Sequence, residues 1–564
     1  MKKKLFDIWG QKGVGTTLLL ACPLLLLLQF WRPYFFLTDD SFTLAFPVWV
    51  SVGQKIWAGA NPFISQELFG GNYPLYRDAA FNVLWHPVVL LLSLFSPTFL
   101  RNALVDLYAM GNLLLAVAGF RWLLRKLGEA RLTSVTPGFA VFLSLSYGFS
   151  MYSLLVGGSW FWYLANVAAL PWLVGVWWEK RTQLFWVITV LSAYHSAVGG
   201  HPSCFVYSML LAVAVGLWKA HEEREFTQIL RYGAALLVAG AAVSPSILPS
   251  LMALSESVRG SALPLTEASK YRMPFQVVLG SAFLGSGSIL LGKFEMFGKV
   301  LHAYALASFV AGGLALTAFF RGRRMWVSWD YLLLGLLAAF ILLVSRPDWL
   351  GHILYHVPVL NGMRWPFKEV FLVVFLLHLW AARGTCLPVK ARNLSAFTGG
   401  LIFMASLTLA GSPSMNEQAA SRRYFLDGAA DVYWEKIRRE LPPGGRVIPL
   451  MDQKLIEDLP RFFEVPLIMT GAGNFPAMYG VSVWNGYSAA VPGGIVARQP
   501  KPAAIVGIFK KEDRAGLQLV PGAVFLEWMD EEPGRIEMHV GSGPGREIWR
   551  QESSGMRRRP ESNR

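Results

Sequence analysis

The apolar run GVGTTLLLACPLLLLLQFW (residues 13–31) is followed a few residues later by the acidic stretch FLTDDS (residues 36–41). The run is long enough to cross a bilayer, because a transmembrane helix needs about 20 predominantly apolar residues. Asp39 and Asp40 then stand at the mouth of that helix, where a carboxylate must be solvated, paired or used. Two interpretations are open: the pair marks the helix end in interfacial water, or it has a function.

The composition of the whole chain is that of a polytopic helical membrane protein. Of its 564 residues 54% are hydrophobic and only 15% are charged, with a mean hydropathy of +0.41, and a soluble domain does not need so many long apolar runs. The net charge of +15 comes largely from short basic clusters between apolar segments. That pattern orients a protein in a membrane, so we expect no nucleic-acid partner. The three cysteines are too far apart to indicate a disulfide framework or a metal site.

The basic clusters predict which face of the membrane each loop occupies. If all of them are cytoplasmic, as the positive-inside rule favours, the chain makes eleven crossings, with the N-terminus inside and the C-terminal region outside. The clusters lie at residues 2–12, 121–131, 180–181, 219–224, 321–324 and 383–392. The expected crossings are residues 14–31, 103–121, 135–153, 160–178, 184–198, 202–218, 227–250, 300–320, 327–345, 369–383 and 394–411. Two weaker stretches, 82–96 and 276–291, do not fit as full crossings; if both cross, the count is thirteen.

The composition of the sequence changes near residue 411. Residues 1–411 are expected to form the transmembrane helical domain, with a long first exported loop at residues 32–102. Residues 412–564 are more polar, with Pro/Gly breaks and short β-type runs, and predict a small exported α+β or β domain. The last residues, about 551–564, are predicted to be a disordered tail.

In this topology the unusual polar and aromatic residues gather on the exported face. The first exported loop is too long to be a mere connector, which predicts a folded functional element. The residues are Asp39, Asp40, Tyr73 and His86 in the first loop, Trp160, His195 and His201 in the following turns, and Arg346, His356, Arg364 and Lys368 in the last loop.

Arg364 and Lys368 stand four residues apart at the start of a predicted helix. Helical spacing would put both cations on one face, at a helix end whose backbone N–H groups also favour anions. Cations outside the membrane, against the positive-inside bias, indicate an anionic partner such as phosphate. The alternative is an interfacial belt in which these cations meet lipid headgroups.

His201 lies in the turn Gly199-Gly200-His201-Pro202. The glycines would let the backbone approach a ligand closely, but a histidine that only caps the following helix is an equal alternative. His352 and His356 share a helical spacing, yet no Glu stands between them as in a zinc-protease helix. We therefore predict no metal site.

Five short motifs occur in order along the chain: Asp39-Asp40 after the first helix, Gly200-His201-Pro202, Arg364-Trp365-Pro366, residues 473–480 (GNFPAMYG) and Asn485-Gly486-Tyr487. With these motifs the chain resembles the C-type glycosyltransferase superfamily, and within it the YfhO-type bacterial membrane proteins. Two departures are Ser203, where such proteins often have Gln, and a C-terminal domain that is shorter than usual.

The resemblance implies an enzyme of the bacterial cytoplasmic membrane that uses a polyprenyl-phosphate sugar donor and a glycan or lipid acceptor. Asp39 or Asp40 would act as the general base. Arg364, with Lys368, Arg346 and His201, would hold the donor phosphate. The acceptor cavity would be lined by His86, Tyr73, Trp160, His195 and His356. The sequence indicates no certain cofactor, although a divalent cation, Mg²⁺ or Mn²⁺, bridging carboxylate and phosphate is compatible with the superfamily.

Two other classes of function stay open. A transporter or flippase for lipid-linked sugars would need polar residues distributed through the span, and Asp106 is the clearest charge of that kind. A non-catalytic envelope assembly protein would use the helices only as an anchor, and its Asp39, Asp40 and Arg364 would be replaceable.

Overall fold

The computed structural model divides the chain into two compact units. The helical unit comprises residues 1–36, 105–247 and 261–412, and the second unit comprises residues 37–104, 248–260 and 413–564. The structure describes residues 12–31, 34–37, 40–94, 103–133, 135–254, 266, 272–276, 278, 295–296, 299–300, 326–357, 366–383, 428–451, 473–484, 486, 509–513, 523–532, 535–541, 547–552 and 555–559.

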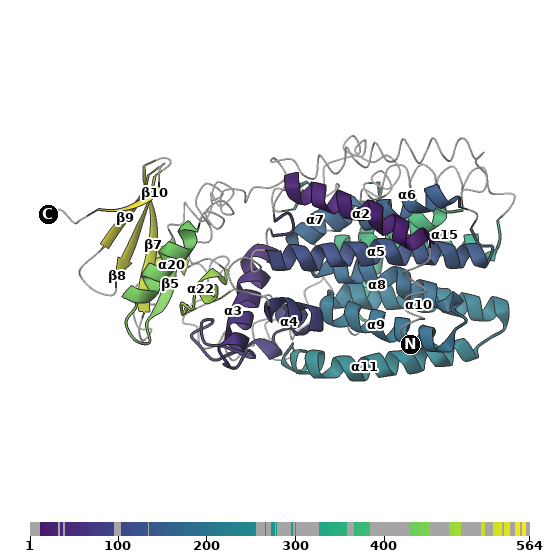
Figure 1. The fold of residues 1–564 in the computed structure, drawn as a ribbon, viewed down its shortest axis with the longest axis horizontal. Helices are drawn as coiled ribbons and strands as arrows, with labels where there is room; N and C mark the ends of the chain where they lie inside the picture. The colour runs from purple at the N-terminus through teal and green to yellow at the C-terminus, as the bar shows by residue number, and fades with distance from the viewer. Residues whose placement is uncertain are drawn as a thin grey trace. The chain divides into compact units, whose positions relative to one another are not determined.

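Long apolar helices make up the helical unit (Figure 1). Among the described residues, five helices are long and apolar enough to cross a membrane, and the shorter apolar segment Tyr163–Trp178 accompanies them. This confirms a polytopic helical membrane protein. The elements are α2 (Lys12–Trp31), α5 (Leu104–Glu129), α6 (Pro137–Gly148), α7 (Met151–Ser159), α8 (Tyr163–Gly175), η5 (Val176–Trp178), α9 (Thr182–Gly199), α10 (Pro202–Glu223), most of α11 (Thr227–Leu254), β3 (Glu295–Met296), β4 (Lys299–Val300), α15 (Ser328–Ser345), α16 (Asp348–Tyr355), η10 (Pro366–Glu369) and α17 (Val370–Ala381).

One predicted crossing is wrong in detail. The segment 135–153 is not a single helix, because the chain breaks at Phe149 and Ser150 between α6 and α7. The Ser150 side chain accepts a hydrogen bond from the backbone N–H of Ser153, a typical N-cap that starts the new helix. The predicted crossings 300–320 and 394–411 and most of the weak stretch 276–291 lie outside the described residues, so the count of eleven stays a prediction.

Aromatic side chains fill the interior of the helical unit. Trp177 packs directly over Gly216 of α10, and its indole N–H donates to the Ala212 carbonyl at 2.8 Å. A Cβ atom on Gly216 would lie 2.0 Å from the Trp177 ring, so only glycine fits there. Such close approach lets apolar helices pack without a hydrophobic driving force between them.

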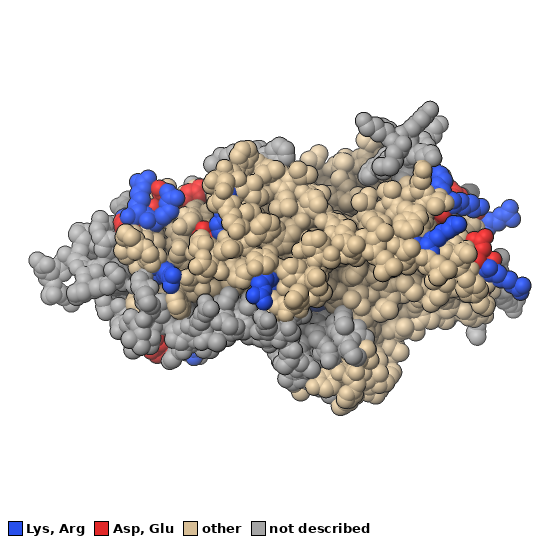
Figure 2. All heavy atoms as spheres, turned by 90° about the horizontal axis from the view of Figure 1, so that it is seen from below, with Lys and Arg blue, Asp and Glu red and all other residues tan. Residues whose placement is uncertain are grey.

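Charged side chains gather at one end of the helical unit, where α5 and α10 end (Figure 2). Lys126 of α5 pairs with Glu179 at 3.1 Å. Arg383, just beyond α17, pairs with Asp330 at the start of α15 and donates to the Leu132 carbonyl. These contacts bring three of the predicted basic clusters, residues 121–131, 180–181 and 383–392, to the same end.

The second unit combines the first loop with the C-terminal region. The loop contains η1 (Ser41–Ala45), α3 (Phe46–Trp57), β1 (Ile64–Ser65), β2 (Tyr73–Pro74), η2 (Leu75–Arg77), η3 (Ala79–Trp85) and α4 (Pro87–Leu94). With only eight residues, α4 is too short to cross a bilayer. The C-terminal region contains α20 (Ala429–Glu440), β5 (Arg446–Met451), α22 (Phe475–Met478), β6 (Phe509–Lys510), η14 (Lys511–Asp513), β7 (Ala523–Glu532), β8 (Arg535–Gly541), β9 (Glu547–Glu552) and β10 (Gly555–Arg559).

The C-terminal strands form one mixed sheet in the order β10-β9-β8-β7-β5-β6. Strand β5 is parallel to β7 and β6, and the other neighbours are antiparallel. This gives the small α+β domain that the sequence predicts. The predicted disordered tail differs in one respect: Gly555–Arg559 forms β10 and pairs with β9, because its residues continue the antiparallel ladder.

Candidate functional site

The N-terminus of α10 is built around His201. Its Nδ1 lies 2.8 Å from the Ser203 hydroxyl, and its backbone N–H donates to Asn166 Oδ1 at 2.7 Å. His201 is the N-cap of α10, so the capping role left open by the sequence is present. A Cβ on the preceding Gly200 would lie 2.3 Å from the Ser196 carbonyl oxygen, which explains the glycine. The His201 ring also stacks on Tyr163 at a centroid distance of 4.7 Å.

Lys368 lies in η10 with its ammonium against two aromatic rings. Its Nζ is 5.3 Å from the centroid of Tyr163 and 5.6 Å from that of Trp160. The residue is only 7% exposed, so this cation has exchanged water for ring faces. Tyr152 of α7 holds the backbone in place by donating to the Lys368 carbonyl at 2.7 Å.

Arg346 ends α15 in a left-handed conformation (φ 41°) and is 2% exposed. The left-handed backbone at a helix C-cap is usual for glycine and uncommon for arginine. Its backbone carbonyl accepts from Arg272 at 3.2 Å, and its guanidinium interacts electrostatically with Tyr207 and with Glu369. Arginine therefore occupies a buried position at the end of a membrane helix, where its charge is costly.

Glu369 is a residue that the sequence reasoning missed. It is fully buried at the N-cap of α17, where its side chain makes no capping hydrogen bond. Its carboxylate interacts with Arg346, Lys368 and the Ser203 hydroxyl, yet within the described part of the chain neither oxygen has a donor in full hydrogen-bond geometry. The signal was available, because an acid directly before the apolar run of α17 carries the same cost that singled out Asp39 and Asp40.

Together these side chains form what we call the basic–aromatic cluster: Trp160, Tyr163, His201, Arg346, Lys368 and Glu369. Two basic side chains stand against one carboxylate in a buried, ring-lined setting. Charge-assisted hydrogen bonds are strongest in such a setting, and phosphate is the anion whose geometry suits Arg and Lys together. The cluster brings together four of the predicted site residues, Trp160, His201, Arg346 and Lys368.

The predicted residues of the first loop belong to the second unit. Asp40 is half-buried and leads directly into η1. Tyr73 donates to the buried Asp78 carboxylate at 2.5 Å, and Asp78 accepts from the Ala80 N–H, so this pair shapes the loop. His86 caps α4 by accepting from the Val88 N–H at 3.3 Å. Burial lowers the pKa of His86 to about 4, which keeps it a neutral acceptor at pH 7.

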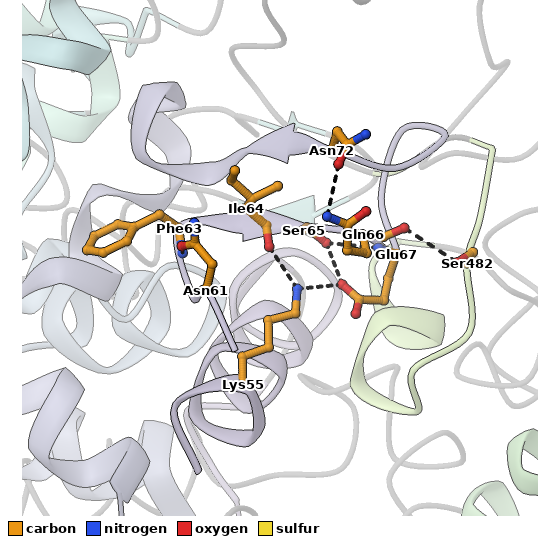
Figure 3. A network of polar contacts seen from close by, with 9 residues as sticks. All are labelled: Lys55, Asn61, Phe63, Ile64, Ser65, Gln66, Glu67, Asn72 and Ser482. Carbon is orange, nitrogen blue, oxygen red and sulfur yellow. Dashed lines mark hydrogen bonds and ion pairs between the residues drawn. The ribbon is translucent and has the colours of Figure 1, made fainter. Parts of the chain in front are cut away.

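A polar network joins residues of the first loop (Figure 3). The Lys55 ammonium pairs with Glu67 at 2.6 Å and donates to the Ile64 carbonyl. The C-terminal segment joins this network, because the Val483 N–H donates to the Glu67 carbonyl and Ser482 lies against Gln66. The loop and Val483 thus share backbone pairing, since the Gly70 N–H also donates to the Val483 carbonyl.

The remaining predicted residues lie elsewhere or outside the described residues. His195 pairs with Asn112 of α5 at 2.7 Å, and Asp106 accepts from Gln29 and from the Phe36 N–H. His356 is exposed at the end of α16. Asp39 and Arg364 lie outside the described residues. Within the described residues, no three His, Cys, Asp or Glu side chains gather as a metal site.

Comparisons with known proteins leave the family open. No protein-family model and no curated protein matches the sequence. Among solved structures, the chain is similar to ArnT from Cupriavidus metallidurans bound to undecaprenyl phosphate, with 13% sequence identity, 91% of this chain and 93% of that chain covered, and a TM-score of 0.42. A likeness this weak carries no argument about the chain, and the YfhO-type resemblance stays a prediction.

Proposed function

We propose that the protein is a membrane glycosyltransferase that moves a sugar from a polyprenyl-phosphate donor to a glycan or lipid acceptor of the cell envelope. The observation that supports this most is the basic–aromatic cluster. Arg346 ends α15 and Lys368 lies in η10, both buried, and an anionic headgroup is the partner that such a pair of basic side chains favours. The acidic pair Asp39 and Asp40, at the start of the first loop, supplies the base.

In the proposed reaction the acceptor hydroxyl oxygen attacks the anomeric carbon of the donor. Asp39 or Asp40 takes the hydroxyl proton as the new C–O bond forms. The bond between the anomeric carbon and the phosphate oxygen breaks, and the polyprenyl phosphate leaves with the electron pair. Lys368 and Arg346, joined by Arg364, hold the charge that develops on the leaving phosphate, which stabilises the transition state more than the ground state.

The proposed orientation follows from the charged end of the helical unit. Lys126, Arg181 and Arg383 belong to the end that we place in the cytoplasm, in agreement with the positive-inside rule. Helix α15 has 18 residues, a length of roughly 27 Å, so Arg346 at its far end would reach the exported face of a bacterial cytoplasmic membrane. The first loop and the C-terminal domain would lie on that face.

A matched pair of lipids tests the donor site. The purified full-length protein in lipid nanodiscs is titrated with a short polyprenyl phosphate and with the same polyprenol lacking phosphate, and binding is followed by native mass spectrometry. We expect the phosphate to bind at least tenfold more tightly, because charge-assisted hydrogen bonds to a buried site contribute about 1.5–3 kcal/mol each. Equal binding of the two lipids would remove the main support for the proposal.

The chemistry is tested with radiolabelled polyprenyl-phosphate hexoses and envelope acceptor fractions. Transfer is expected in the wild type and should be lost in Asp39→Asn/Asp40→Asn, which keeps the side-chain size but removes the base. Movement of the donor across a sealed vesicle without transfer would favour a flippase instead. Full complementation by the double variant in cells, with normal expression, would favour a non-catalytic assembly protein.

A further inference from the structure

The chain directly after Asp40 forms an unusual turn. Ser41–Ala45 (η1) is a π-helix, in which the Phe46 N–H bonds back to the Ser41 carbonyl, and all five of its residues are buried. Single π-turns are rare and occur often at functional sites, because the wider ring changes the direction of the side chains around it. Asp40 is the N-cap of this turn, so the turn sets the position of its backbone.

A residue from the C-terminal region holds this turn. The backbone N–H of Asn474 donates to the Thr43 carbonyl at 2.9 Å, and its side-chain amide donates to the Leu44 carbonyl at 2.9 Å. Asn474 is fully buried, so these two bonds are shielded from water and costly to break. Thr43 and Leu44 are consecutive residues of η1. The residue four positions after Thr43 is Pro47, which has no N–H, so an α-helical turn could not supply a donor to the Thr43 carbonyl from within its own chain.

The residues beside Asn474 are shaped for the same contact. Gly473 has a positive φ of 60°, and a Cβ there would lie 2.6 Å from the Thr43 carbonyl oxygen, so only glycine allows the approach. On the other side, the ring of Phe475 meets Phe42 edge-on at a centroid distance of 4.7 Å. Three consecutive residues of the motif 473–480 therefore contact the turn.

We infer that Asn474 is a positioning residue of the proposed transferase: it fixes the π-turn that carries Asp40. The C-terminal domain then belongs to the catalytic apparatus and is not only a partner-binding module. Asn474 touches no reacting atom and acts through the backbone of Ser41–Ala45. The inference rests on the proposed function, because its consequence is the placement of the base.

The test compares three variants of the full-length protein in nanodiscs. Asn474→Asp keeps the size of the side chain but removes the amide donor to Leu44. Ser482→Ala is the matched control, since Ser482 also donates from the C-terminal region to a carbonyl of the first loop, that of Gln66, but at an exposed site. Asp39→Asn/Asp40→Asn removes the base. The measurements are kcat, KM for the donor, the melting temperature and hydrogen exchange of the segment 41–46.

For Asn474→Asp we expect kcat to fall by about 100-fold with KM within threefold, since small misplacement of a catalytic group costs on this scale. Exchange should accelerate in the segment 41–46, while the melting temperature stays within a few degrees. Ser482→Ala should behave like the wild type. This KM-against-kcat split is not expected of a residue that only stabilises the fold.

Failure of this inference can be distinguished from failure of the proposed function. An unchanged kcat in Asn474→Asp, while Asp39→Asn/Asp40→Asn is inactive, overturns this inference alone. Faster exchange throughout residues 37–94 together with a large loss of melting temperature also overturns it, because Asn474 would then be merely structural. If the wild type transfers no sugar, or the double variant stays active, the proposed function fails and this inference fails with it.

Discussion

The two ends of the helix pair α15 and α17 carry the same kinds of charge and use them differently. At one end, the Arg383 guanidinium meets both oxygens of Asp330 at 2.6 and 2.7 Å, and its third nitrogen donates to the Leu132 carbonyl. At the other end, Lys368 faces aromatic rings, and the Glu369 carboxylate interacts with the Ser203 hydroxyl, but among the described residues no donor reaches it in full hydrogen-bond geometry.

The difference separates a satisfied structural ion pair from the cluster that we propose as the donor site. A buried pair contributes to stability only when its hydrogen bonds are satisfied in good geometry, and Arg383 with Asp330 meets that condition. The basic–aromatic cluster keeps charge at a helix end without closing all of its hydrogen bonds. That arrangement is the reason for proposing a ligand there.

The largest effect is expected from breaking the ion pair between Arg383 and Asp330. Asp330→Ala leaves the Arg383 guanidinium largely buried without its carboxylate and also removes the acceptor of the Val327 N–H. We expect a loss of about 3–5 kcal/mol of unfolding free energy, measured by thermal unfolding in detergent. The control is Lys436→Ala, which breaks an exposed pair with Glu440 and should cost less than 1 kcal/mol. Equal effects of the two variants would contradict the structural role.

At the basic–aromatic cluster, we expect a substitution to change ligand binding and not folding. Lys368→Met should weaken binding of a short polyprenyl phosphate by roughly 10- to 100-fold, the equivalent of about 1.5–3 kcal/mol. The matched control is Lys219→Met, because Lys219 lies at the opposite end of α10 from His201 and pairs with Glu223. If both variants bind alike, the cluster is not the donor site.

Glu369→Gln sharpens the comparison by removing the only carboxylate of the cluster. The substitution removes a negative charge beside the two basic side chains, so affinity for the phosphate lipid should increase by roughly three- to tenfold, the equivalent of about 0.7–1.4 kcal/mol. Binding is again followed by native mass spectrometry. A decrease in affinity would mean that the carboxylate contacts the ligand itself, directly or through a cation.

The smallest expected effect is a pH dependence of the melting temperature that comes from Glu179, at the same end of the helical unit as the Arg383–Asp330 pair. Burial acts to raise the pKa of Glu179, but hydrogen bonds from the Arg181 N–H and the Lys126 ammonium outweigh it, and the pKa lies below its ordinary value. A lowered pKa means that this contribution is present above the ordinary Glu value of about 4.3 and is lost as pH falls through the folded pKa. The gap in melting temperature between wild type and Glu179→Gln should therefore be widest above pH 5 and shrink toward pH 3. A gap that widens in acid would contradict this sign.

Much of the fold could be predicted from the sequence because membrane helices are set by local composition. The predicted crossings 184–198, 202–218, 227–250 and 327–345 correspond to α9, α10, α11 and α15. The helix break at Ser150 was not predicted, because the segment around it is largely apolar and its main signal is the Ser150 hydroxyl that caps α7. Among the site residues, His201 was singled out together with its capping alternative, whereas Glu369 was overlooked beside the more conspicuous Arg364 and Lys368.

The sequence by itself determined that the chain is a polytopic membrane protein with a small C-terminal domain, because length and hydropathy alone decide whether a segment enters a bilayer. It also singled out Asp39 and Asp40 by the cost of a charge at a helix mouth. Only the tertiary structure decided that Lys368 faces Trp160 and Tyr163, that Glu369 joins Arg346, and that Asn474 holds the turn after Asp40. Apart from the contact of Glu369 with Arg346, these contacts join residues hundreds of positions apart, and no local propensity encodes a partner at that distance along the chain.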